Sequence, residues 1–237
     1  MSAAAQPSGA PAAQPDRSAA LVVALLLLTF GTGLIDAVSF LGLGHIFTAN
    51  MTGNIVFLGF ASAGVPGLSI VRSLTSLGSF LLGAVAGGRF AQAFASISKR
   101  RWLFVSTLTE AALLGAALLA ADGFDIRSGA PPQRLYVVIV TTAVAMGMRN
   151  ATIRRLAVPD LTTTVLTLTL TGIAADSALA GGSHPRLNRR LAAVLLMFAG
   201  AAAGAFLLNY GLAAPLGLCL VSTLAAGTAF RSASLEK

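Results

Sequence analysis

Apolar residues gather in eight stretches that short polar segments separate. The stretches cover roughly residues 19–43, 46–62, 74–95, 102–121, 135–150, 161–178, 191–208 and 211–230. A helix that crosses a membrane needs about 20 predominantly apolar residues, so this pattern predicts six to eight membrane segments. Two stretches, 46–62 and 161–178, also carry many polar residues, and we call them the two polar stretches. The pattern predicts an all-α polytopic membrane protein.

One long polar break, residues 122–134, divides the chain into halves of similar length. It contains Pro131 and Pro132 next to several charged residues, which is typical of an extramembrane loop. The first 18 residues are rich in Ala, Pro, Ser and Gln and predict a disordered tail. The expected order is the tail 1–18, a first membrane repeat 19–121, the loop 122–134, a second membrane repeat 135–230 and a C-terminal tail 231–237.

The two halves resemble each other weakly. An offset of 114 residues, or 117 further along, aligns Gly33 with Gly147, Asp36 with Asn150, Ala37 with Ala151, Thr48 with Thr162, and Gly83 and Gly87 with Gly200 and Gly204. One such match could arise by chance in a chain rich in Gly and Ala, but their preserved order favours a duplication. Transporters often carry internal repeats of this kind.

Charge counting separates the alternative topologies, because cytoplasmic loops carry an excess of Lys and Arg. If all eight stretches cross, the 16 bases divide almost evenly between the two sides. If the two polar stretches enter and return without crossing, only Arg72, Arg127 and Arg134 lie outside and the other 13 lie inside. This arrangement has six crossings and both termini in the cytoplasm. A seven-crossing arrangement, with the N-terminus outside and only 161–178 not crossing, remains an alternative.

Six crossings give each half three transmembrane helices. Because three is an odd number, the two halves then have opposite orientations in the membrane. The predicted fold is therefore two inverted repeats of three transmembrane helices, each with a short broken or re-entrant segment.

The two polar stretches have an unusual spacing. Thr48, Asn50, Thr52 and Asn54 occupy every second position of the first, and threonines alternate with leucines from 167 to 171 in the second. A period of two favours an extended backbone. Such a backbone survives at membrane depth only where protein or a watery cavity satisfies its polar groups. We therefore expect both stretches inside the bundle, extended at first and then helical. Short helices whose threonines bond to their own carbonyls remain the alternative.

Broken segments that approach from opposite faces form the midplane sites of many secondary transporters. Their freed amide groups and half-helix N-termini favour an anion or a polar solute. The expected substrate-binding residues are Asn50, Thr52, Asn54, Asn150, Thr162 and Thr164.

Two carboxylates lie inside apolar stretches, Asp36 in the first and Glu110 in the fourth. A charge near the bilayer centre costs roughly 2.5–3.5 kcal/mol on insertion scales, so such residues usually face a cavity and have a role. Both are candidates for coupling transport to a proton or another ion. Asp36 could equally be a buried cap or a structural hydrogen-bond partner of 46–62. For Glu110, helix packing or an outer-leaflet position is the favoured alternative.

A basic cluster joins the fifth stretch to the second polar stretch: Arg149, Arg154 and Arg155, followed by Asp160. The functional interpretation is a cytoplasmic cationic vestibule that draws in an anionic solute. The alternative, slightly favoured, is a set of topology determinants with an ion pair between an arginine and Asp160. The glycine pairs 83/87 and 200/204 are small-xxx-small motifs and predict packing between the repeats, with a homodimer face as the alternative.

Composition excludes several classes of protein. Only 10% of the 237 residues are charged and 56% are hydrophobic, whereas soluble domains carry about 25% charged residues. This excludes an ordinary cytosolic enzyme, a secreted disulfide scaffold and a disordered regulator. The net charge of +8 comes from short basic clusters between apolar runs, which indicates contact with anionic lipid heads and no nucleic-acid partner.

Candidate catalytic chemistry is missing from the sequence. Cys219 is the only cysteine and lies in an apolar stretch, and His45 and His184 match no metal-binding spacing. The sequence also lacks the phosphate-binding loop, dinucleotide, zinc-protease and nucleophile-elbow motifs. We therefore expect no metal, no cofactor and no enzymatic activity. The expected partners are the lipid bilayer and a small polar or anionic solute.

Two segments carry a resemblance to a known family. Residues 36–54, with Asn-Met-Thr-Gly-Asn at 50–54, and residues 148–169, with Pro-Asp-Leu-Thr-Thr-Thr-Val at 159–165, are together similar to the YoaK-type family of bacterial membrane proteins. That family carries a domain of unknown function, and the resemblance covers about residues 20 to 230. It implies a location in the bacterial inner membrane and supplies neither a substrate nor catalytic residues.

These observations favour a small secondary transporter or permease with a midplane site between inverted repeats. A passive channel, or a membrane component that organises lipids or a partner complex without transport, is the alternative.

Overall fold

The computed structural model describes residues 19–94, 98–158, 166–183 and 186–233. Within these ranges the secondary structure is helical and contains no strand, as the apolar pattern predicted. The main helices are α1 (Ala19–Ala37), which continues into the π-helix η1 (Val38–Gly42), α2 (Met51–Ser62), α3 (Ile70–Ala93), α4 (Lys99–Ala121), α5 (Pro132–Leu156), α6 (Leu166–Ala175), α7 (Leu187–Leu207) and α8 (Ala213–Ser232). Two 3-10 turns, η2 (Ala178–Ala180) and η3 (Leu208–Tyr210), complete the described helical elements.

Six of these helices are long and apolar enough to cross a membrane: α1 with η1, α3, α4, α5, α7 and α8. The helices in the two polar stretches are much shorter, with 12 residues in α2 and 10 in α6. At a rise of 1.5 Å per residue, neither reaches across a hydrocarbon core about 30 Å thick. The prediction of six membrane-spanning helices and two shorter segments is thus confirmed for the described residues.

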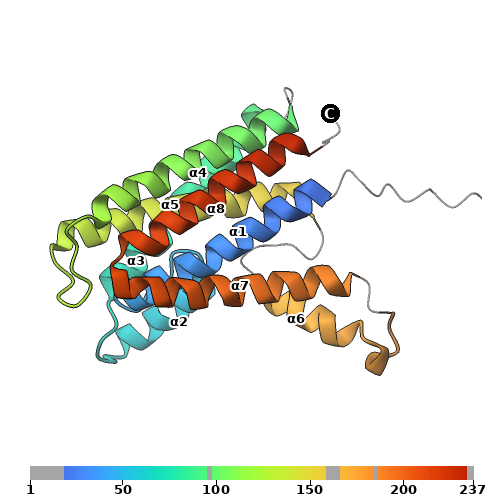
Figure 1. The fold of residues 1–237 in the computed structure, drawn as a ribbon. Coiled ribbons are helices and arrows are strands. Elements are labelled where there is room, and N and C mark those ends of the chain that lie inside the picture. The colour runs from blue at the N-terminus through green and yellow to red at the C-terminus, as the bar shows by residue number, and fades with distance from the viewer. Residues whose placement is uncertain (1–18, 95–97, 159–165, 184–185, 234–237) are drawn as a thin grey trace, which may run out of the picture.

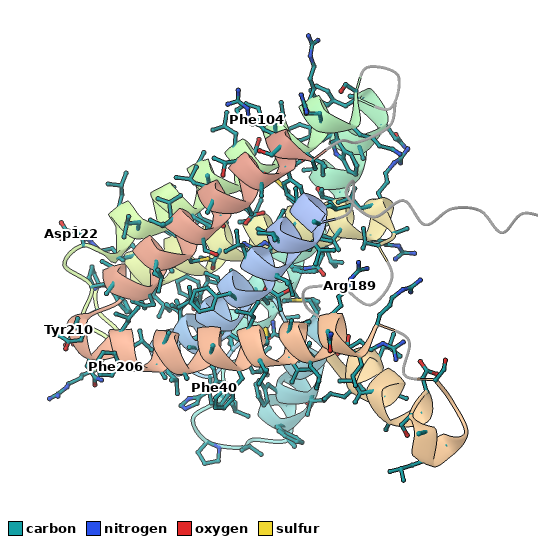
Figure 2. The ribbon with its side chains drawn as sticks, turned by 45° about the vertical axis from the view of Figure 1, so that its right-hand side comes forward. Phe40, Phe104, Asp122, Arg189, Phe206 and Tyr210 are labelled. Carbon is teal, nitrogen blue, oxygen red and sulfur yellow. The ribbon has the colours of Figure 1, made fainter. Side chains whose placement is uncertain are left out.

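The long helices lie side by side in an elongated bundle (Figure 1). The start of α1 and the end of α8 lie at the same end, which we call the termini end. The α4–α5 connection and the turn between α7 and α8 lie at the opposite end, which we call the loop end. Figure 2 shows Asp122 and Tyr210 at the loop end. The two short helices point to opposite ends, α2 to the loop end and α6 to the termini end (Figure 1).

The helices of the two halves interlock. Helix α1 packs against α7 and α8, whereas α5 packs against α3 and α4, and α4 also contacts α8. In the alignment of the halves, α1 corresponds to α5, α3 to α7 and α4 to α8. Each contact therefore recurs with the halves exchanged. The first long helix of each half therefore packs mainly against the two other long helices of the opposite half.

Glycines allow the closest of these contacts. A Cβ atom on Gly33 of α1 would overlap the Met197 carbonyl oxygen of α7, and one on Gly147 of α5 would overlap the Phe80 carbonyl oxygen of α3. Met197 follows Phe80 by 117 residues, and Gly147 follows Gly33 by 114. The same backbone contact is thus present twice, at the two offsets that align the halves.

The four glycines of the small-xxx-small motifs serve these same contacts. Gly83 and Gly87 of α3 face Val144 and Met148 of α5, and Gly200 and Gly204 of α7 face Phe30 and Leu34 of α1. All four are buried. The prediction of packing between the halves is confirmed. These glycine faces contact helices of the other half of the same chain.

The outer surface of the bundle is strongly apolar. Leu82, Leu119 and Phe198, on three different spanning helices, are 69%, 78% and 72% exposed. Apolar side chains on this scale are costly in water but are accommodated by lipid tails. The interior holds a continuous core that includes Leu34, Ile139 and Leu216, all fully buried.

Candidate functional site

The first polar stretch folds in the order that its spacing predicted. Helix α1 and η1 end at Gly42, residues 43–50 form no regular helix, and α2 begins at Met51. Leu43, Ile46 and Thr48 are completely buried, and Leu43 and Ile46 pack in the same apolar cluster as Leu34 and Ile139. Part of the non-helical segment therefore packs into the core of the bundle. The expectation that the whole stretch lies inside is wrong for α2, in which only Asn54 is buried. We call residues 43–62 the entry segment.

Asn54 satisfies the backbone of the entry segment. Its Oδ1 accepts a hydrogen bond from the Phe47 N–H at 2.8 Å, and its Nδ2 donates to the Phe47 carbonyl. The Ser76 hydroxyl of α3 donates to the same carbonyl at 2.6 Å. One amide thus replaces the strand partner that Phe47 lacks, which explains how an irregular backbone is accommodated in an apolar bundle.

The neighbouring residues of the motif have related local roles. The Asn50 side chain caps α2 by accepting a hydrogen bond from the Gly53 N–H at 3.2 Å. Gly53 leaves room for a ring, because a Cβ atom there would lie 2.7 Å from Cδ2 of Phe47. The Phe47 ring stacks on Phe40 and Phe57, with centroids 5.4 and 5.7 Å apart. The Asn-Met-Thr-Gly-Asn motif therefore holds the entry segment in shape.

These contacts bear on the residues predicted to bind a solute. The side chains of Asn50 and Asn54 bind the backbone of their own segment, and Thr52 is exposed. Asn150 donates to the Met146 carbonyl at 2.8 Å on its own helix, α5. Thr162 and Thr164 lie outside the described residues. Solute binding by this set stays a prediction.

Two other buried polar atoms, one in α1 and one in the entry segment, lack a hydrogen-bond partner among the described residues. They are Asp36 Oδ1, near the end of α1, and Thr48 Oγ1, within the segment. An unsatisfied buried polar group typically costs about 1–3 kcal/mol. Such groups persist in native proteins mainly where they have a functional reason. The π-helix η1 follows directly after Asp36 and Ala37, and π-bulges are frequent at functional sites.

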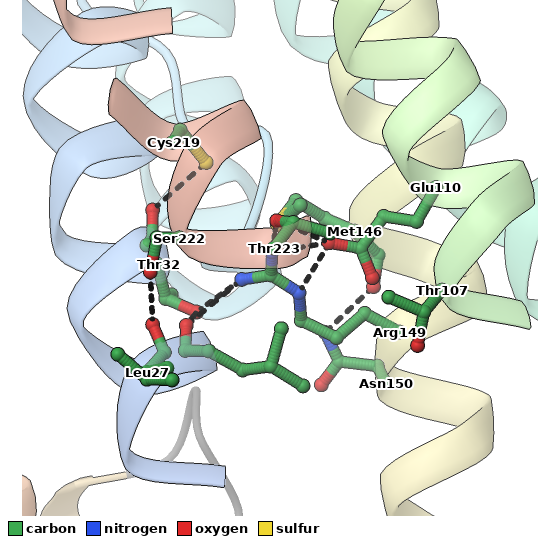
Figure 3. A network of polar contacts seen from close by, with 12 residues as sticks. Leu27, Thr32, Thr107, Glu110, Met146, Arg149, Asn150, Cys219, Ser222 and Thr223 are labelled. Carbon is green, nitrogen blue, oxygen red and sulfur yellow. Dashed lines mark hydrogen bonds and ion pairs between the residues drawn. The ribbon is translucent and has the colours of Figure 1, made fainter. Parts of the chain in front are cut away.

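A buried ion pair lies further towards the termini end. Arg149 of α5 and Glu110 of α4 bond through Nε and Oε1 at 3.0 Å and through a second, shorter contact from Nη2. Their side chains are only 1% and 5% exposed. The remaining guanidinium contacts reach α1 and α8 (Figure 3): Nη1 donates to Leu28 O at 2.9 Å and Thr32 Oγ1 at 3.0 Å, and Nη2 donates to Thr223 Oγ1 at 3.2 Å.

This network uses the full hydrogen-bonding capacity of the arginine. A guanidinium group has five N–H donors, and the five contacts just described account for all of them. The Thr223 hydroxyl in turn donates to Glu110 Oε1 at 3.2 Å. Arg149 therefore joins α1, α4, α5 and α8 and has no donor left for a solute in this conformation. The arginine side chain thus links the two halves of the chain.

The position of Arg149 corrects the predicted vestibule. Arg149 is buried, whereas Arg154 and Arg155 are exposed, and Asp160 lies outside the described residues. Helical geometry explains the difference, since steps of five and six residues turn the side chain by about 140° and 240°. Arg149 therefore faces the interior and the other two face outwards. For Glu110, the structure supports the helix-packing interpretation and supplies its partner, Arg149.

The Glu110–Arg149 pair was not predicted from the sequence. The two residues are 39 positions apart and lie on neighbouring helices. One signal could have revealed them: each is a charged residue of opposite sign within or at the edge of an apolar stretch, and charges inside a membrane usually pair with one another.

A small cavity adjoins the ion pair. It measures about 10 Å³ and is lined by Leu28, Ser106, Thr107, Glu110, Arg149, Thr152, Ile153 and Phe230. This is about the volume that one water molecule needs. The hydroxyls of Ser106 and Thr152 are buried and have no hydrogen-bond partner among the described residues. Polar groups near Arg149 thus include these two hydroxyls as well as its direct hydrogen-bond partners.

Other polar groups nearby do not assemble into a metal centre. Among the described residues, no group of three or more His, Cys, Asp or Glu lies close enough to hold a metal ion. Cys219 is buried, with Sγ 3.5 Å from the Gly31 carbonyl.

Comparisons with known proteins place the chain in a family. The family described as "Protein of unknown function (DUF1275)" matches residues 24–229. The UPF0700 transmembrane protein YoaK of Bacillus subtilis (strain 168) is 33% identical over 156 residues, which cover 64% of this chain and 65% of that protein. The aligned part thus spans slightly less than two thirds of this relative. No solved structure matches the chain. Because the family match covers nearly all of the described helices, this multi-pass membrane protein belongs to the DUF1275 family.

Proposed function

We propose that this protein is a small secondary transporter or permease that moves a small polar or anionic solute across the bacterial inner membrane. The observation that carries the proposal is the entry segment, in which a non-helical stretch at 43–50, with Leu43, Ile46 and Thr48 fully buried, leads into the short helix α2. Non-helical backbone at membrane depth is expensive unless protein or a cavity satisfies it. Secondary transporters use such interrupted segments to form their solute sites.

The packing of the halves supports the rest of the architecture. The contacts of α1 with α7 and α8 recur as those of α5 with α3 and α4, as expected for two inverted repeats. The second polar stretch would then supply the matching broken segment from the other side. Exposed bases at the termini end, among them Arg100 at the start of α4 and Arg155 at the end of α5, favour a cytoplasmic location for both termini. The half-buried Arg189 lies at the same end (Figure 2).

The proposal assigns different tasks to the buried charged residues. Asp36, seven residues before the entry segment, has a buried oxygen without a hydrogen-bond partner among the described residues, so we assign it the coupling of transport to a proton or another cation. Arg149 and Glu110 form a buried, hydrogen-bonded ion pair, and we assign this pair the role of holding the helices together.

A test that needs no knowledge of the solute uses the buried residue Thr48. Thr48→Cys in a Cys219→Ser background is exposed to a membrane-impermeant maleimide in right-side-out and in inverted vesicles. A transporter opens its interior to water on each side in turn, so labelling should occur in both preparations. Leu43→Cys, in the same segment, provides a buried reference for non-specific labelling. A Thr48→Cys protein that neither preparation labels contradicts the proposal.

Coupling is tested in proteoliposomes on a solid-supported membrane. Stepwise addition of inorganic phosphate, sulfate, acetate and glycine should reveal a saturable current for at least one solute, with an amplitude that depends on pH. Asp36→Asn should remove the pH dependence, whereas Asp122→Asn, an exposed residue of the loop end, should preserve it. A conductance that rises linearly with concentration would instead identify a passive channel.

A further inference from the structure

An apolar groove lies on the outer face of the bundle, between α4 and α8. It has a volume of about 240 Å³, and its walls include Phe104, Leu108, Leu224, Thr228 and Arg231. Phe104, Leu108 and Leu224 are 39%, 53% and 47% exposed, so the groove opens towards the surrounding lipid.

A glycine creates the floor of this groove. Gly227 of α8 also lines it, together with Thr107 of α4. A Cβ atom on Gly227 would lie 3.0 Å from Cγ2 of Thr107, so the two helices approach closely at this level. The larger side chains of Phe104 and Leu224 stand on either side. The groove is therefore a fixed consequence of helix packing.

Basic residues border the groove where it meets the termini end. The guanidinium carbon of Arg231, next to the last residue of α8, lies 5.4 Å from the centre of the Phe104 ring. Lys99, Arg100 and Arg101 begin α4 and are all exposed. Helix α8 contains no acidic residue, and the only one in α4 is Glu110, which pairs with Arg149. No carboxylate on either helix competes for these bases.

We propose that this groove binds an anionic phospholipid, with an acyl chain against Phe104, Leu108 and Leu224 and the headgroup phosphate beside Arg231. Two features identify the ligand: the positive charge beside the groove and the position of that charge along the spanning helices. The bases lie at the end of spanning helices, where headgroups are found, and apolar walls lead from there into the bilayer. Arginine matches a phosphate well through its planar set of donors.

The bound lipid would lie close to the ion pair. Thr107 lines the groove and also the small cavity that contains Glu110 and Arg149. One threonine therefore separates the acyl chain from the polar centre of the bundle. The lipid site is independent of any transported solute, so it can stand even if the proposed transport fails.

The proposal is tested by native mass spectrometry of the full-length protein in detergent, titrated with dioleoyl phosphatidylglycerol or dioleoyl phosphatidylethanolamine. The wild-type protein should retain one phosphatidylglycerol more strongly than phosphatidylethanolamine. Arg231→Gln should weaken phosphatidylglycerol binding about fivefold, the effect of one base near a membrane surface. Thr228→Trp, which fills the groove from its exposed rim, should remove one bound lipid of either kind.

The matched control is Arg127→Gln, which removes an exposed base at the loop end. It should leave the preference for phosphatidylglycerol unchanged. Equal binding of the two lipids to the wild-type protein would overturn the proposal. So would a full preference for phosphatidylglycerol in both Arg231→Gln and Thr228→Trp, because the lipid would then bind elsewhere.

Discussion

Arg149 of α5 and Glu110 of α4 neutralise each other inside the bundle, and the same arginine reaches a backbone carbonyl of α1 and a hydroxyl of α8. Charged pairs cost much to bury, and removing one partner costs more than removing both because the remaining charge has no counterpart. The pair therefore makes the arrangement of four helices depend on one side chain.

Arg149→Met should lower the free energy of unfolding by about 3–5 kcal/mol, because it leaves Glu110 buried without its partner. The double variant Arg149→Met/Glu110→Leu should recover most of this loss. Thermal denaturation in detergent measures both. The control Arg154→Met, on an exposed position of the same helix, should stay within about 0.5 kcal/mol of wild type. If the double variant is less stable than either single variant, the pair has a different role.

The glycine contacts predict a paired response in the two halves. Gly33→Ala and Gly147→Ala should each destabilise the protein by about 1–3 kcal/mol or more, since the new methyl group overlaps a carbonyl oxygen of the neighbouring helix. Gly78→Ala and Gly115→Ala, where a Cβ atom meets open space, should be neutral or stabilising by up to about 1 kcal/mol. Melting temperatures in one detergent compare the four. Unequal losses at Gly33 and Gly147 would show that the contacts are not equivalent.

Replacing Asn54 should destabilise the entry segment more than replacing its neighbour Thr52. Asn54→Ala leaves both backbone groups of Phe47 with fewer partners, at a cost of about 1–3 kcal/mol. Hydrogen–deuterium exchange should show faster exchange at residues 43–50 and little change in α4. Thr52→Ala, at an exposed position, should leave the exchange of this segment as it is in wild type. Slow exchange at residues 43–50 in Asn54→Ala would mean that other contacts hold them.

Cysteine labelling tests the topology. In a Cys219→Ser background, Val65→Cys lies between α2 and α3, and Leu179→Cys follows α6; both original side chains are exposed. If α2 and α6 enter and return from opposite ends, an impermeant maleimide should label these two positions from opposite sides of a sealed vesicle. Labelling from the same side would indicate eight crossings.

Several features of this fold could be predicted from the sequence because the bilayer imposes simple rules. A spanning helix must be about 20 residues long and apolar, so α3 and α7 were visible as continuous runs. The alternation of polar residues from Thr48 to Asn54 indicated a non-helical start in the first polar stretch, which the structure shows. In the second polar stretch the same spacing was misleading, because the alternating threonines at 167–171 lie within helix α6, as the alternative of a short helix predicted. Residues 159–165 lie outside the described part.

The contacts of individual polar side chains could not be predicted in this way. Asn54 inside an apolar stretch must be satisfied, but a solute and the backbone of Phe47 are equally good partners on chemical grounds. The pair of Glu110 and Arg149 depends on which faces of α4 and α5 meet. Packing over the whole bundle determines which faces meet, and a single sequence does not show these contacts directly.

The interlocked pairing of the halves also constrains how the chain is assembled. Helices α3, α4 and α5 follow one another along the chain and contact one another, so they can dock as they leave the translocon. Helix α1 precedes its neighbours α7 and α8 by about 150 residues or more along the chain. During synthesis α1 must therefore stay in the bilayer without these two partners until both have been inserted.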